Sequence, residues 1–114
     1  MLIGLLIPAA ARSGITQFDY GTTAAGQDGY GRGGYSVYIY KSSNNTWEAW
    51  GANPETKTVS IANYIDANYR VWFLVMNQYP FDSNASTCYA SVDYMYLTVT
   101  YTPATSFTPI ITQF

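Results

Sequence analysis

The stretch Tyr69–Met76, YRVWFLVM, is apolar on both faces of the β-strand that it predicts. Successive side chains of a strand point to opposite faces. Each face of this strand therefore carries three apolar residues, Val71, Phe73 and Val75 on one face and Trp72, Leu74 and Met76 on the other. The pattern is typical of a strand that is covered on both sides. We predict that Tyr69–Met76 is a central strand of the fold.

Further strand-like stretches, separated by turn residues, lie on both sides of this segment. They are Gly14–Tyr20, Tyr35–Lys41, Thr46–Trp50, Thr56–Ile61 and Cys88–Tyr101, the last long enough for one bent strand or two. The SSNN sequence at residues 42–45 predicts a hairpin, and the glycine-rich residues 21–34 predict a loop. No window has the apolar period of a helix of normal length. The chain is therefore expected to be all-β, an antiparallel sandwich or barrel of about seven to eight strands.

Two of these stretches carry tyrosines on the face that does not suit a core. In Asp93–Tyr101, DYMYLTVTY, alternation gives a core face of Met95, Leu97, Val99 and Tyr101 and an opposite face of Tyr94, Tyr96, Thr98 and Thr100. In Tyr35–Lys41, Tyr38 and Tyr40 point away from Val37 and Ile39 in the same manner. We group the outward tyrosines with two nearby tryptophans as the predicted aromatic surface, which consists of Tyr38, Tyr40, Tyr94, Tyr96, Trp47 and Trp50.

Three hypotheses account for the predicted aromatic surface. The rings could cover one another or lie under the N-terminal segment, because tyrosine fits a pleated, half-buried surface. They could form a subunit interface, since tyrosine and tryptophan give a large rigid contact area with a polar tip. They could also stack on sugar rings. Alternation does not tell which face of a sandwich a given strand presents, so the three hypotheses remain open here.

The order of segments from Lys57 to Tyr101 resembles part of a known architecture. A short strand TVSI, a turn ANYIDAN, the strand YRVWFLVM, a polar loop and the strand SVDYMYLTVTY follow one another. This order is similar to the second half of a jelly-roll β-sandwich of the galactose-binding or carbohydrate-binding-module type. Such jelly rolls serve as glycan binders, enzyme accessory domains, virion proteins and subunits of surface filaments. The resemblance implies a jelly-roll-like sandwich, and it carries over no sugar-binding or calcium-binding residue.

Composition restricts the class of function. Charged residues make up 11% of the chain, against roughly 25% in globular proteins. So low a charge content is more typical of a surface that contacts a partner than of a surface that is fully exposed to water. With 5 basic and 7 acidic side chains there is no basic patch for nucleic acid. The chain has no histidine, which removes Ser-His-Asp and Cys-His nucleophiles and most zinc sites, and its acidic residues are scattered. We predict a protein that is not an enzyme, with no catalytic residue, no metal and no cofactor.

Both ends of the chain are apolar. The run Leu2–Ala11 is too short to span a bilayer, so we predict no membrane span, and it could be a docking arm, a signal-like segment or a core strand. The tail TPATSFTPIITQF ends in Ile111–Phe114, which repeats the ITQF of Ile15–Phe18. We interpret the repeat as coincidence, with strand addition to neighbouring subunits by both ends as the alternative. The predicted assembly interface consists of Leu2, Ile3, Leu5, Leu6, Ile7, Ile110, Ile111 and Phe114.

Two smaller features have a structural explanation and a functional one. The single cysteine, Cys88, rules out an intrachain disulfide and is predicted to be a small core residue. The loop residues Asp82–Asn84 offer oxygen atoms that suit either calcium or a simple Asx turn.

We therefore predict an N-terminal arm at residues 1–13, a sandwich at 14–102 and a C-terminal arm or edge strand at 103–114. The predicted function is that of a structural subunit, such as a virion decoration, head or tail protein or a surface-filament subunit. Its predicted partners are copies of itself or other structural subunits, and its predicted location is a virion or the extracellular surface. The alternative is a carbohydrate-binding module that docks on glycans.

Overall fold

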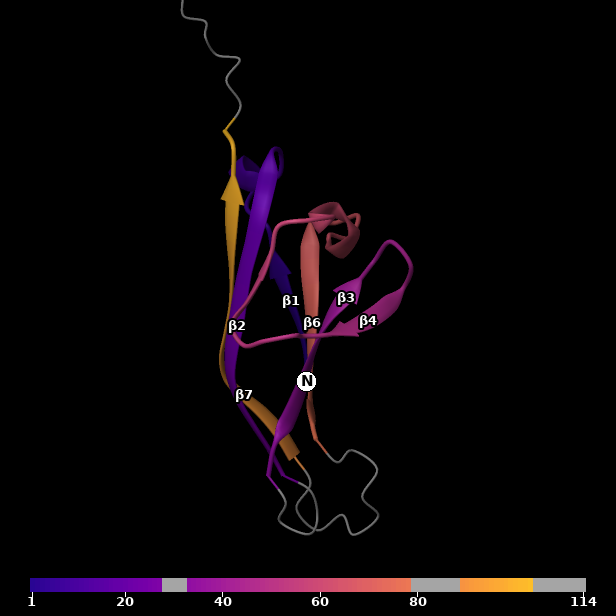
Figure 1. Ribbon diagram of the computed structural model, residues 1–114, viewed down its shortest axis with the longest axis vertical. Helices are drawn as coiled ribbons and strands as arrows, with labels where there is room; N and C mark the ends of the chain where they lie inside the picture. The colour runs from indigo at the N-terminus through magenta and orange to yellow at the C-terminus, as the bar shows by residue number, and fades with distance from the viewer. Residues whose placement is uncertain (28–32, 79–88, 104–114) are drawn as a thin grey trace, which may run out of the picture.

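A computed structural model describes residues 1–27, 33–78 and 89–103, which form two antiparallel β-sheets packed face to face (Figure 1). One sheet has four strands in the order β1 (Leu2–Leu6), β6 (Arg70–Asn77), β3 (Tyr35–Lys41) and β4 (Thr46–Ala49). The other has three strands in the order β5 (Glu55–Lys57), β2 (Ile15–Gln27) and β7 (Tyr89–Tyr101). Single turns of 3₁₀ helix lie at η1 (Ala9–Ala11) and η2 (Ile61–Tyr64). The prediction of an all-β antiparallel sandwich is confirmed.

Strand β6 lies inside the four-stranded sheet, paired with β1 on one side and β3 on the other. Its residues Val71, Phe73 and Val75 are fully buried between the two sheets. Its other apolar residues, Trp72, Leu74 and Met76, are only half-buried. The central position of this strand is confirmed, but within the described residues no second layer covers its outer face.

The long ladder between β2 and β7 differs from the predicted loop at residues 21–34. Pairing continues as far as Gln27, which lies opposite Tyr89, so residues 21–27 are strand rather than loop. The glycine at position 21 fits because its neighbour Tyr96 lies across it: a Cβ there would come within 2.7 Å of the tyrosine ring. The register shifts between Thr23 and Ala24, which leaves Asp93 as the extra residue of a bulge in β7. β7 is therefore a single strand with a bulge, one of the two outcomes that the sequence allowed for this stretch.

The N-terminal segment differs from the predicted arm, because it is a strand of the sandwich itself. Leu2–Leu6 pairs with Arg70–Leu74, and the amide of Val75 donates to the carbonyl of Met1 at 2.8 Å. Ile7 is fully buried in the core. The physical reason is that this edge of β6 would otherwise leave its backbone N–H and C=O groups unpaired, and Leu2–Leu6 pairs with them. The fold therefore has no boundary at residue 13.

The hydrophobic core lies between the sheets, and its largest fully buried side chains come from β2, β3 and β6 and from Ile7, which follows β1. The rings of Tyr20 and Phe73 lie 5.3 Å apart across the interior. Half-buried Met95, Leu97 and Val99 of β7 pack against this cluster, as the alternation of DYMYLTVTY predicted. The hairpin of β3 and β4 is confirmed, whereas the strand predicted over Thr56–Ile61 is confined to β5, which ends at Lys57.

Several predicted features lie outside the described residues. These are Cys88, the loop Asp82–Asn84 and the C-terminal interface residues Ile110, Ile111 and Phe114. The jelly-roll connectivity that the resemblance implied also stays a prediction.

The two faces of β6 give a direct test of this fold. Phe73→Ala removes a ring that is fully buried, so the free energy of unfolding should fall by about 3–5 kcal/mol. Its neighbour Leu74 points to the outer face, and Leu74→Ala should cost roughly 1 kcal/mol. Urea unfolding followed by tryptophan fluorescence measures both values. Equal costs for the two substitutions would contradict the assignment of the faces.

Candidate functional site

The predicted aromatic surface is divided between three places in the structure. Tyr38, Tyr40 and Trp47 lie on the outer face of the four-stranded sheet, because Tyr38 is paired with outward Leu74 and Tyr40 with Trp47. The tyrosines of β7, Tyr94 and Tyr96, lie on the outer face of the other sheet.

The remaining member, Trp50, belongs to the interior rather than to a surface. Its ring makes an edge contact with Tyr20, with centroids 4.8 Å apart, and a second with Phe73 at 5.6 Å. The sandwich therefore separates residues that the sequence analysis grouped into one predicted aromatic surface.

The outer face of the four-stranded sheet is mostly apolar, and we call it the outer apolar face. It is formed by outward side chains of β1, β6, β3 and β4, namely Leu2, Trp72, Leu74, Tyr38, Tyr40 and Trp47. Trp47 keeps 40% and Leu2 57% of its surface exposed. Arg70, opposite Leu6 at one end of the sheet, is the charged residue among the outward positions of these strands. Four adjacent strands thus present an almost uncharged surface to solvent.

A shallow hollow of about 220 Å³ lies in the outer apolar face, lined by Leu2, Tyr40, Trp47 and Trp72. The rings of Tyr40 and Trp47 pack at 5.0 Å. Trp72 lies over Gly4, where a Cβ would come within 2.6 Å of its ring, so the glycine lets the indole lie flat on the sheet. The hollow is therefore formed by rings held in place by packing.

The polar tips of two lining residues of this hollow are already hydrogen-bonded. The indole N–H of Trp72 donates to Oδ2 of Asp66 at 2.8 Å, and the hydroxyl of Tyr40 donates to Oδ1 of Asn45 at 2.8 Å. Burial by itself raises the pKa of the Asp66 carboxyl. The hydrogen bonds from Trp72 and from the amides of Arg70 and Asn68 outweigh burial and lower this pKa. Asp66 therefore stays ionised at neutral pH and holds Trp72 in its orientation.

The outer face of the three-stranded sheet is different in character. Tyr94 and Tyr96 pack against each other with centroids 5.7 Å apart, and Tyr94 is 58% exposed. Around them lie outward polar side chains, including Thr23, Thr98 and Asp19. This face is hydroxyl-rich and can be solvated by water, so it has less need of a partner than the outer apolar face.

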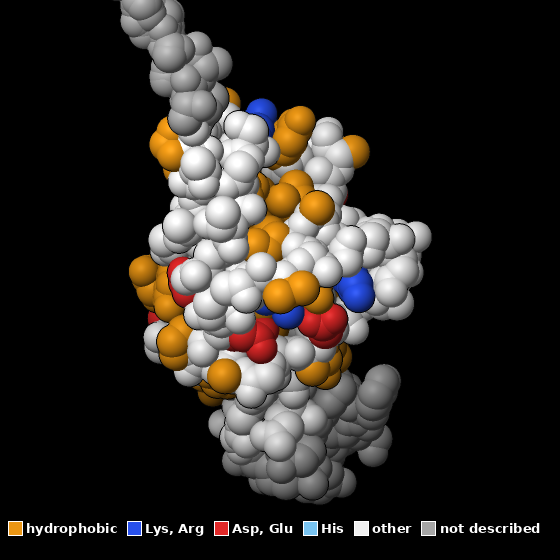
Figure 2. All heavy atoms as spheres, turned by 45° about the horizontal axis from the view of Figure 1, so that its top comes forward, with side chains coloured by type: hydrophobic (Ala, Val, Ile, Leu, Met, Phe, Trp, Pro, Cys, Tyr) orange, Lys and Arg blue, Asp and Glu red, His pale blue; other side chains and the backbone are white. Residues whose placement is uncertain are grey.

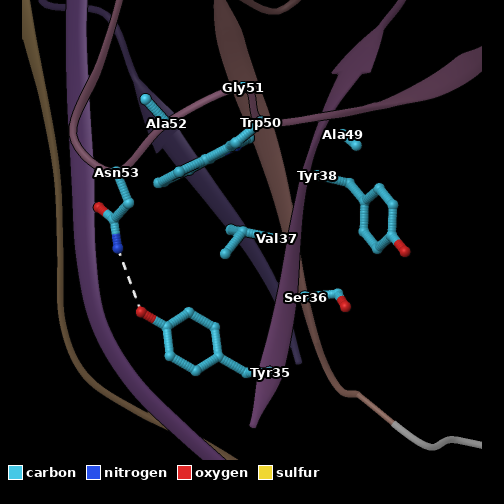
Figure 3. Close-up of a pocket in the computed structure, with 9 residues that line it drawn as sticks. All are labelled: Tyr35, Ser36, Val37, Tyr38, Ala49, Trp50, Gly51, Ala52 and Asn53. Carbon is cyan, nitrogen blue, oxygen red and sulfur yellow. Dashed lines mark hydrogen bonds between the residues drawn. The ribbon is translucent and has the colours of Figure 1, made fainter.

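A larger pocket of about 380 Å³ opens where β4 ends and the chain crosses to β5 (Figure 3). Tyr35, Val37 and Trp50 lie on its inner side, with Asn53 at its rim. The amide of Asn53 bonds both backbone groups of Thr22, at 3.0 and 2.9 Å, and donates to the hydroxyl of Tyr35 at 3.1 Å. The indole nitrogen of Trp50 is buried without a hydrogen-bond partner. The pocket thus combines two aromatic rings with fixed polar groups.

A charged cluster joins the edges of the two sheets at β4 and β5. Lys57 donates to Oε1 of Glu48 at 2.9 Å, and the hydroxyl of Tyr64 donates to the same carboxylate at 2.9 Å. Burial, together with the hydrogen bond that Tyr20 donates to Glu55, raises the pKa of Tyr20 and keeps its hydroxyl protonated. Figure 2 shows acidic and basic side chains next to one another on one face of the molecule. Since both carboxylates are held by these donors, we interpret the cluster as a clamp between the sheets.

The predicted N-terminal interface residues are divided by the alternation of β1. Leu2 and Leu6 point outward and are exposed, whereas Ile3 and Leu5 point toward the interior and Ile7 is fully buried. Sequence reasoning missed Trp72 and Leu74, which it assigned to a covered face, and Tyr35 and Asn53, for which alternation gave no signal. The alternation of YRVWFLVM did place Trp72 and Leu74 on one face of the strand. It could not indicate that this face of the sheet has no second layer over it.

Over residues 1–27, 33–78 and 89–103, no group of three or more Cys, Asp or Glu residues is placed to hold a metal ion. In the same part of the chain, no helix is long and apolar enough to cross a membrane.

Comparison with known proteins gives no match: the chain is matched by no protein-family model, no curated protein and no solved structure. Inference about function therefore depends on the geometry of the outer apolar face and of the pocket beside Trp50.

The clamp between the sheets predicts a loss of stability in acid. The hydrogen bond from Lys57 holds the pKa of the Glu48 carboxyl below its usual range. The ionised Glu48 therefore stabilises the fold fully above the pKa that its carboxyl has in the unfolded chain, about 4.3. This stabilisation is lost as the pH falls through the lower pKa of the folded state. Urea unfolding between about pH 5 and pH 3 should show this loss, and Glu48→Gln should reduce it. An unchanged pH dependence in the variant would contradict the role of Glu48.

Proposed function

We propose that this protein is a non-enzymatic structural subunit that assembles with copies of itself or with other structural subunits through the outer apolar face. The observation that carries the proposal is that four neighbouring strands present aromatic and aliphatic side chains to solvent, with Arg70 at one end as the charge. Soluble monomers rarely expose a large contiguous apolar surface, and such surfaces mark interaction sites. A virion component or a surface-filament subunit is the class of protein that this proposal fits.

The chemistry of the shallow hollow favours a protein partner over a sugar. Ligand sites need a few free polar groups to orient the ligand, whereas the N–H of Trp72 and the hydroxyl of Tyr40 already donate to Asp66 and Asn45. At about 220 Å³ the hollow is also smaller than the roughly 300–1,000 Å³ of small-molecule pockets. It suits one apolar side chain of a partner, and interfaces are rich in tryptophan and tyrosine of this kind.

A charge placed on the outer apolar face should dissociate the assembly. Trp47→Glu puts a carboxylate at a position that is 40% exposed, so the fold should tolerate it, while desolvation of the charge opposes association. The dissociation constant should rise by at least about tenfold. Sedimentation velocity over a range of protein concentrations measures it.

Tyr94→Glu is the matched control, because it puts the same charge on an exposed aromatic position of the opposite face. The control should assemble like the unmodified chain. A chain that stays monomeric at all concentrations, or equal association of the two variants, would contradict the proposal.

A second candidate function is glycan binding in the pocket beside Trp50. The specific observation is that this pocket, at about 380 Å³, lies within the range of ligand sites and has two rings, Tyr35 and Trp50, on the same side of β3 as the side chain of Asn53 (Figure 3). Sugar recognition combines aromatic contact with hydrogen-bonding groups, and among the residues that line this pocket the indole nitrogen of Trp50 has no hydrogen-bond partner.

Substitution at the pocket tests the second candidate. Tyr35→Ala removes a ring and the hydroxyl that Asn53 contacts, so binding on a glycan array should be lost. Tyr94→Ala, on the other sheet, should leave any such binding unchanged. An array without signal for the unmodified chain, or a signal that survives Tyr35→Ala, would remove this candidate.

A further inference from the structure

The two sheets of the sandwich differ in width, and the difference leaves one strand position open. Strand β6 lies over β7 and β2, β3 lies over β2, and Lys57 of β5 bonds Glu48 of β4 at 2.9 Å. In this facing order β1, at the edge of the four-stranded sheet, has no opposite strand among those that the structure describes. The open strand position lies beside β7, which also contacts the single turn η1.

The side chains next to this position are incompletely covered. On β2, Phe18 and Tyr20 are fully buried, but their cross-strand neighbours on β7, Val99 and Leu97, are only half-buried. On the facing sheet Ile3 points inward beside Phe73, yet it is half-buried and lies outside the hydrophobic core cluster. A strand added beside β7 would cover apolar side chains from both sheets.

Strand β7 is also suited to accept such a strand. It is 13 residues long, and in the described part of the chain it pairs only with β2, on one of its edges. Asp93 is the single charged side chain along it. Natural proteins normally protect a long edge strand with charges, prolines or a cover, because its free backbone groups pair readily with another chain.

The sequence contains a segment that matches this position. Ile111–Phe114 is identical to Ile15–Phe18. In the structure Ile15–Phe18 already pairs with the end of β7, with Phe18 opposite Val99, Gln17 opposite Thr100 and Ile15 opposite Tyr101. The same four side chains are therefore known to fit against this part of β7 from one side.

We propose that Ile111–Phe114 of a second copy adds as an antiparallel strand to the free edge of β7, with Phe114 opposite Val99 and Gln113 opposite Thr100. Phe114 then points to the interior side, toward Leu97 and Ile3, and Gln113 points outward. This inference rests on the proposed function as an assembly subunit, and it names the segment that links one subunit to the next. Backbone pairing supplies affinity, and the buried phenylalanine sets the register.

A second copy is a better donor than the same chain. In the same chain, residues 102–110 would have to form the hairpin connection, which is longer than the roughly 2–5 residues of most hairpin loops. The backbone of Thr102 is moreover held by its bond to the carbonyl of Gly14, at 2.8 Å, on the β2 side of β7. When the segment Ile111–Phe114 comes from a second copy, the chain does not have to turn back on itself after β7.

Cross-linking tests the register and the donor together. Two full-length chains that both carry Cys88→Ser are mixed under mild oxidation, one with Thr100→Cys and the other with Gln113→Cys and a mass tag. Directly opposite residues of an antiparallel pair lie close enough for a disulfide. We expect several-fold more mixed dimer than from a control pair in which Thr23→Cys replaces Thr100→Cys. Equal yields of mixed dimer from the two pairs would overturn the proposal.

Substitution of the donor residue separates this proposal from the proposed function. Phe114→Asp should weaken association by at least about tenfold in sedimentation velocity, because its carboxylate would enter the core side of the sheet. Phe107→Asp puts the same change outside the repeated segment and should leave association unchanged. If Phe114→Asp associates normally while Trp47→Glu does not, strand donation is wrong and the proposed function stands. If the unmodified chain is monomeric, both are wrong.

Discussion

The packing of one tyrosine between the two sheets is the interaction on which the rest of the structure depends. The ring of Tyr20, on the central strand of the three-stranded sheet, lies 5.3 Å from Phe73 and 4.8 Å from Trp50. Its hydroxyl cannot be buried without a partner, and it donates to Glu55. Glu55 lies on β5, beside the lysine that bonds Glu48 of β4. The buried hydroxyl of Tyr20 thus explains why Glu55 lies where the sheets meet, next to Lys57 and Glu48.

The low charge content and the pairing of the strands together decide which surfaces are left for partners. The chain has 5 basic and 7 acidic side chains in 114 residues, so few charges lie on the outer faces. The four-stranded sheet then presents tryptophan, tyrosine and leucine outward, and the three-stranded sheet presents hydroxyl groups. The unequal strand number adds an open position beside β7. The outer apolar face and the free edge of β7 belong to different sheets, so one subunit could contact two neighbours, as a growing assembly requires.

The fold was largely predictable because alternation is a local property. Residues Tyr35–Lys41 and Asp93–Tyr101 alternate in the sequence, and both are strands with their apolar residues toward the interior. The prediction failed where small residues were involved. Gly21 and its neighbours look like a loop, yet they continue β2, because the ring of Tyr96 covers the glycine from the adjacent strand. That contact joins residues far apart in the chain, and local sequence cannot indicate it.

The sequence by itself determined the fold class, the inward residues of each strand and the scarcity of charge, because these follow from side-chain period and composition. Only the tertiary structure decided which outward residues share a face. It placed Tyr38 and Tyr40 on one sheet and Tyr94 and Tyr96 on the other, moved Trp50 into the interior, and turned the N-terminal segment into an edge strand. The physical reason is that the sheet to which a strand belongs depends on pairing with strands far away in the sequence. The residues of one strand do not specify which strand it pairs with.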